Sequence, residues 1–162
     1  MKTKTTLVIA ALAVVLGVAF AAWSETATIQ VNAQTGYIDA DFQKVQVTAS
    51  SYVDATYSTS GSASGNDGAP SLTVSISNAY PGAQVQVYFE IYNDGTIPIR
   101  FTSCTASGDT DKLTVSGLPT TPFTLNPGSA QSVTLTITAG SDVEEQQSYS
   151  VTIQCTYEQA VP

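Results

Sequence analysis

Apolar and polar residues alternate one by one along most of residues 37–159, and no window shows the 3.6-residue period of an amphipathic helix. The alternation is clearest in residues 84–93, where one side carries Val85, Val87, Phe89 and Ile91. Alternation of this kind is typical of strands that bury one face. The pattern predicts strands at residues 37–49, 51–58, 72–77, 84–93, 97–106, 113–116, 132–139 and 148–159.

Turn-forming residues separate the predicted strands, and the strongest signals are Pro81-Gly82, Asn93-Asp94-Gly95, Ser107-Gly108-Asp109 and Asn126-Pro127-Gly128. The apolar phase changes within the first strand, which predicts a β-bulge near Gln43 and Lys44. Residues 58–70 are rich in Ser and Gly and are expected to form a surface loop. Short strands at this spacing predict an all-β chain in which residues 34–162 form one antiparallel β-sandwich, jelly-roll or immunoglobulin-like in arrangement.

The N-terminus has the pattern of an export signal. Two lysines precede an apolar run over residues 7–22, which ends in small residues. We expect residues 1–22 to be a secretory signal peptide that is cut after Ala22, so that the chain meets the membrane only during export and becomes extracellular. Two alternatives stay open: a retained membrane anchor, and a type IV pilin or archaellin in which cleavage precedes the apolar run and leaves it as a helix.

Residues 23–33 form a further strand pattern directly after the expected cleavage site. Their apolar side consists of Trp23, Ala27, Ile29, Val31 and Ala33. Such a strand could pair within its own domain. It could also leave its own subunit and complete the sheet of a neighbour, because an open sheet edge offers unpaired backbone groups to an extended segment. A head-to-tail contact of this kind does not close and produces a filament.

The chain has two cysteines, Cys104 and Cys155. In an exported chain they are expected to form one disulfide, and two unpaired buried thiols are the alternative. The alternation pattern places them on different faces of their strands, so a bond between them requires a bulge or a position at the sheet margin.

Charge and composition exclude several classes of function. The chain has 5 Lys+Arg, 13 Asp+Glu and no histidine, and its formal net charge is -8. An acidic chain repels nucleic acid, and a chain without histidine contains neither a His-dependent triad nor a His-ligated metal. We therefore expect no enzymatic activity, no catalytic residue, no cofactor and no metal.

Three close sets of acids and two tyrosines are further candidate sites. The acids are expected to form a solvated margin rather than a calcium site, because they lack the spacing of a calcium-binding loop; they are Asp39 and Asp41, Asp109 and Asp111, and Asp142, Glu144 and Glu145. Tyr88 and Tyr92 lie on the predicted outer face of one strand. They are expected to cover the sheet surface, with lateral filament contacts or sugar stacking as the functional alternatives.

Two motifs carry a resemblance to a known family. The first is Ala21-Ala22-Trp23-Ser24-Glu25-Thr26 followed by Gln34-Thr35-Gly36-Tyr37-Ile38-Asp39. The second is Ile76-Ser77-Asn78-Ala79-Tyr80-Pro81-Gly82 followed by a strand that ends in Asn93-Asp94-Gly95-Thr96. Together they resemble the TasA/camelysin-type family of secreted fibre subunits. The resemblance covers roughly the first 100 residues, and the short threonine-rich chain looks most similar to the archaeal bundling pili. It implies a jelly-roll subunit of an extracellular biofilm filament, joined to further copies by donor-strand exchange and able to associate laterally.

Two functions follow as competing expectations. The first is a structural subunit of a pilus or matrix filament that polymerises through residues 23–33. The second is a monomeric secreted module that binds a cell surface or a carbohydrate. Although camelysin is associated with proteolysis, this chain has no His-Glu-x-x-His motif, and we expect no protease activity.

Overall fold

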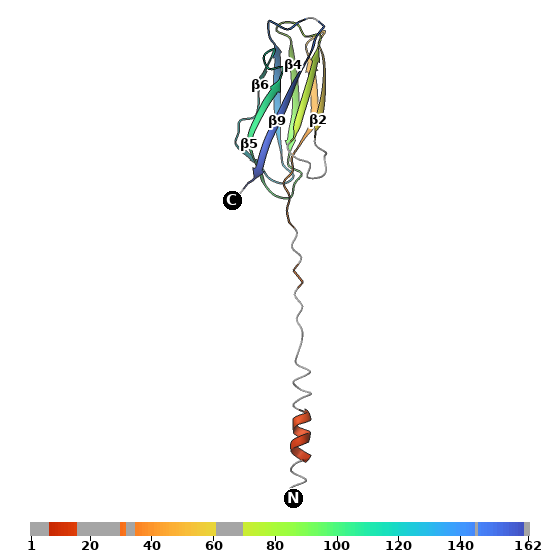
Figure 1. Cartoon of the computed structure of the whole chain (residues 1–162), viewed down its shortest axis with the longest axis vertical. Coiled ribbons are helices and arrows are strands. Elements are labelled where there is room, and N and C mark those ends of the chain that lie inside the picture. Colours follow the sequence, from red (N-terminus) through yellow and green to blue (C-terminus); the bar gives the residue numbers. More distant parts are fainter. Residues whose placement is uncertain (1–6, 16–29, 32–34, 61–69, 145, 161–162) are drawn as a thin grey trace. The chain divides into compact units, whose positions relative to one another are not determined.

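The structure is a computed structural model that describes residues 7–15, 30–31, 35–60, 70–144 and 146–160. The chain divides into two compact units, residues 1–34 and Thr35–Pro162 (Figure 1). In the first unit residues 7–15 form a helix with exposed side chains. Within the described residues, no helix has the length and apolar character needed to cross a membrane.

The second unit is an antiparallel β-sandwich (Figure 1). Its strands are β1 (Asp41–Ala49), β2 (Asp54–Ser60), β3 (Ser71–Ser77), β4 (Gln84–Tyr92), β5 (Ile99–Gly108), β6 (Leu113–Ser116), β7 (Phe123–Leu125), β8 (Ala130–Ala139) and β9 (Ser148–Gln159). One sheet, called sheet A, has the order β1-β4-β8-β6. The other, called sheet B, has the order β2-β3-β9-β5-β7. The all-β antiparallel fold predicted from the alternation is confirmed.

The observed strand bounds agree best with the predicted ones where the alternation of apolar and polar residues is uninterrupted. β6 and β9 have the predicted bounds, whereas β1 begins at Asp41 instead of residue 37. The backbone of Tyr37 is held by Thr96 instead of a strand partner: the Thr96 amide donates to the Tyr37 carbonyl at 3.0 Å. β2 begins later than predicted because residues 51–52 form a turn in which Tyr52 has a φ of 68°. β7 was not predicted.

Two β-bulges adjust the register of the sheets. The predicted bulge in β1 is confirmed, because its pairing with β4 shifts between Gln43 and Gln46. A second shift lies in β5 between Phe101 and Ser103, and it brings Cys104 directly opposite Cys155 of β9. The two cysteines form a disulfide with Cα atoms 4.1 Å apart. The bulge therefore resolves the mismatch of faces that the sequence pattern implied.

The core lies between the sheets and is built from the inward side of each strand. β4 shows the principle, since its apolar residues are all buried and their neighbours face outward. Phe89 packs on Phe42 with ring centroids 4.8 Å apart, and Phe101 stacks on Phe123 at 4.7 Å. Aromatic pairs at these distances add stability beyond the area that they bury.

The prediction of a solvated acidic margin was wrong for one of the three sets of acids. Asp39 and Asp41 are 0% and 3% exposed. They lie where the chain enters the sandwich, and Asp39 accepts hydrogen bonds from the Ala40 amide at 3.0 Å and from the Tyr157 hydroxyl at 3.4 Å. Local hydrogen bonding of a buried carboxylate offsets part of its desolvation. The other described acids of these sets are exposed or half-buried.

Candidate functional site

The candidate site is the edge of sheet A along β8. β8 pairs with β4 along its whole length, from Ala130 to Ala139. On its other side the ladder with β6 covers Thr136 to Ala139. Residues 130–135 therefore have no ladder partner on this side among the residues that the structure describes. An edge of this kind presents unpaired N–H and C=O groups and can accept a further strand.

Local sequence explains why β6 ends so early. Gly117 follows β6 with a φ of 88°, a left-handed conformation that glycine adopts without strain. A Cβ atom at this position would collide with the carbonyl oxygen of Thr134, so the backbones approach each other closely here. Pro119, which follows, has no N–H to donate to a ladder. The chain consequently leaves the ladder with β8 after Ser116, although Gly117 still packs against the backbone of Thr134.

A groove runs beside this open half of β8. It has a volume of about 310 Å³ and is lined by Gly117, Pro119, Thr120, Phe123, Gln131, Ser132, Val133 and Thr134. Phe123 belongs to β7 of sheet B, so the groove lies between an edge strand of one sheet and the open edge of the other. Val133 is buried and points inward, whereas Ser132 and Thr134 are exposed. None of the lining residues carries a charge. We call this feature the β8 groove.

The outer face of sheet A next to the groove is polar and contains an ion pair. The Lys44 ammonium lies 2.8 Å from Glu90 Oε2, and the Tyr88 hydroxyl donates to Glu90 Oε1 at 3.0 Å. The hydrogen bond and charge of Lys44 lower the pKa of Glu90, and Glu90 raises the pKa of Lys44 in return. The charges of this region thus compensate each other outside the groove.

The structure describes only some of the predicted site residues. Trp23, Ala27, Ile29 and Ala33 lie outside them, as does most of the expected signal peptide. Val31 is described and is 82% exposed. Tyr88 and Tyr92 lie on the outward side of β4 and are half-buried. A lateral role for the two tyrosines stays a prediction.

In the buried polar cluster around Asp39, one group has a pKa that differs from its ordinary value. Burial and the nearby Asp39 carboxylate raise the pKa of Tyr157 to about 12. The neutral phenol is therefore favoured, and it can donate its proton to the carboxylate. Among the described residues, no group of three or more His, Cys, Asp or Glu is placed to hold a metal ion.

Comparison with known proteins does not assign the chain to a family. A scan against protein-family models, a search of curated proteins and a search of solved structures each returned no match. The resemblance to TasA-type subunits stays a prediction. Sequence reasoning did not find the β8 groove; the signal for it is the pair Gly117 and Pro119 after a strand of four residues.

Proposed function

We propose that this chain is the structural subunit of an extracellular filament, in which residues 23–33 of one copy occupy the β8 groove of the next. The observation that supports the proposal is the open half of β8, residues 130–135. It borders an uncharged groove, whereas the rest of β8 is paired on both sides, with β4 and with β6. The same chain carries an unassigned strand pattern ahead of the sandwich.

The apolar part of residues 23–33 and the open half of β8 have similar lengths. Residues 130–135 of β8 extend over about 20 Å at roughly 3.3 Å per residue. Ala27, Ile29 and Val31 occupy alternate positions over a similar length. In a paired strand all three side chains would point to one face, next to the inward-facing Val133 and Leu135. A hydrophobic side chain buried there contributes about 1.5–3 kcal/mol, and each backbone hydrogen bond about 0.5–1.5 kcal/mol.

Polymerisation follows if residues 23–33 of each copy enter the next copy. A segment that leaves its own subunit and fills the next one makes a head-to-tail contact, and such contacts propagate unless the rotation closes a ring. The proposal includes the jelly-roll or immunoglobulin-like arrangement of the sandwich, cleavage after Ala22 and lateral association through the outer face around Tyr88 and Tyr92. The disulfide is compatible with an extracellular location.

The experiment compares purified residues 23–162 with the chain that lacks residues 23–33. We expect filaments in negative-stain electron microscopy from the first and soluble monomers from the second. Addition of a synthetic peptide of residues 23–33 to the shortened chain is expected to slow amide hydrogen exchange in residues 130–135. A monomeric longer chain at high concentration, or filaments from the shortened one, contradicts the proposal and favours a monomeric surface module.

A further inference from the structure

A second pocket lies at the other end of sheet A, where β4 begins and β8 ends. It is formed by the connection between β3 and β4 and by the connection between β8 and β9. Its volume is about 210 Å³, and its lining residues are Asn78, Ala79, Tyr80 and Gln146. It shares no lining residue with the β8 groove. We call it the tip pocket.

The lining combines one aromatic ring with two amides. Ala79 is 6% exposed, and Tyr80 is 45% exposed. Asn78 and Gln146 are exposed. Gln146 offers an amide oxygen and an NH₂ group, and Asn78 offers its amide oxygen and one N–H, because its Nδ2 also donates to Asp54. An exposed aromatic face with amides beside it suits a sugar ring, because the C–H face of the sugar packs on the aromatic ring and the hydroxyls pair with amides.

The backbone holds the first wall of the tip pocket rigidly. Asn78 has a left-handed φ of 56°, and its Nδ2 donates to Asp54 Oδ2 at 2.8 Å, which fixes the orientation of the amide. Tyr80 begins a turn over Pro81 and Gly82 that is closed by a hydrogen bond from the Ala83 amide to the Tyr80 carbonyl at 2.9 Å. Both side chains therefore start from constrained backbone positions.

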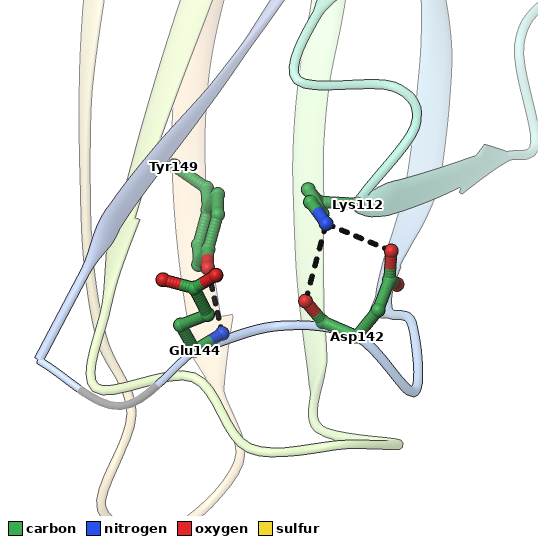
Figure 2. Close-up of polar contacts among 4 residues, drawn as sticks. All are labelled: Lys112, Asp142, Glu144 and Tyr149. Atoms are coloured by element: carbon green, nitrogen blue, oxygen red, sulfur yellow. Dashed lines mark hydrogen bonds and ion pairs between the residues drawn. The ribbon is translucent and has the colours of Figure 1, made fainter.

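The second wall belongs to the connection that Figure 2 shows in close-up. Lys112 Nζ donates to Asp142 Oδ2 at 2.8 Å and to the Asp142 carbonyl at 3.3 Å (Figure 2). The Glu144 amide donates to the Tyr149 hydroxyl at 2.7 Å. These contacts anchor the connection at two points shortly before Gln146, whose own φ is 60°. Left-handed conformations in residues other than glycine are uncommon and cluster at binding sites.

The charge of the tip pocket and its surroundings limits the class of ligand that the pocket can bind. The tip pocket is lined by neutral residues, and the side chain bonded to its wall is the acidic Asp54. The chain as a whole is acidic. An anionic ligand would meet repulsion without a cation in the lining to offset it.

From the ring, the amides and the charge we infer that the tip pocket binds a single neutral sugar residue, either free or at an exposed position of a polysaccharide. The inference is independent of the proposed function, since it holds equally for a monomer and for a subunit in a filament. It gives the protein a contact with glycan at the end of the sandwich that lies away from the open half of β8.

The test is saturation-transfer difference NMR on the purified chain of residues 23–162, because this ligand-observed method works on monomers and on large assemblies. The probes are glucose, galactose, mannose and N-acetylglucosamine at millimolar concentration, with glucuronate as the anionic comparator. We expect transfer to at least one neutral sugar, and a weaker signal for glucuronate. Tyr80→Ala is expected to weaken binding about tenfold, and Tyr80→Phe to retain it.

Tyr57→Ala is the matched control, since Tyr57 is 48% exposed and lies on β2 outside the tip pocket. It is expected to leave the signal unchanged. The inference is overturned if none of the four sugars receives transfer, if Tyr80→Ala retains the full signal, or if glucuronate binds as well as the neutral sugars. None of these outcomes depends on whether the chain forms filaments.

Discussion

A single charge on the apolar side of residues 23–33 provides the sharpest mutational test of strand donation. In the proposed contact the side chain introduced by Ile29→Asp would enter the β8 groove, whose lining contains no residue of opposite charge. The matched control is Gln30→Asp, because residue 30 lies on the other side of the same strand pattern and carries the same new charge toward solvent.

The expected magnitude combines two losses. Removing the buried isoleucine side chain costs about 2 kcal/mol, and placing an unpaired carboxylate in the uncharged groove costs at least about 2 kcal/mol more, even if the carboxylate takes up a proton. The sum of about 4 kcal/mol corresponds to a roughly thousandfold weaker subunit contact, at 1.4 kcal/mol for each factor of ten. The control is expected to change the contact by less than about 0.5 kcal/mol, as is usual for surface substitutions.

The assay is the critical concentration for polymerisation, measured by sedimentation over a concentration series and checked by electron microscopy. Both variants are expected to keep the melting temperature of the soluble subunit, since residues 29 and 30 precede the sandwich unit that begins at Thr35. The reasoning is refuted if Ile29→Asp polymerises at the wild-type critical concentration, or if Gln30→Asp blocks polymerisation to the same extent.

Three further predictions concern the sandwich itself. Replacing Cys104 and Cys155 together by alanine opens a loop with a sequence separation of 51 and is expected to lower the free energy of unfolding by about 4 kcal/mol, measured by denaturant titration against the oxidised wild type. Because the pKa of Tyr157 is raised to about 12 from an ordinary value of 10.0, stability should fall as the pH rises from 10 to 12; thermal melts of Tyr157→Phe should lack this component. Since Lys44 lowers the pKa of Glu90 below its ordinary value of 4.5, the pair stabilises the fold above that pH and ceases to do so as the pH falls through the lowered value. Glu90→Gln should therefore melt below the wild type near pH 7, and the difference should shrink as the pH falls below 4.5; a difference that does not change with pH would contradict the reasoning.

The regular strands could be predicted because their alternation is a local signal. β4 and β6 keep one apolar side from end to end, and β9 keeps one from Tyr149 to Tyr157. The predicted bounds of all three lie within one residue of the structure. β7 has three residues and follows Pro122, so it is too short to produce a period. Its existence depends on β5, with which it pairs, and a contact between distant segments leaves no local pattern.

The burial of Asp39 and Asp41 could not be read from the sequence for a related reason. An acid counts as polar in any alternation pattern, and only the fold shows that the Tyr157 hydroxyl reaches Asp39. The β8 groove likewise results from a difference in length between two paired strands, β6 and β8, which lie apart in the sequence. Gly117 and Pro119 mark where β6 ends, but they do not show which edge is left open.

The most direct test of the account is a helical reconstruction of the filament by electron cryomicroscopy at a resolution that traces the backbone. The account predicts that residues 23–33 of one subunit form a strand hydrogen-bonded to residues 130–135 of β8 in the next subunit, with Ile29 and Val31 facing Phe123. A reconstruction in which residues 23–33 pair within their own subunit, or against the outer edge of β1 or β2, contradicts it.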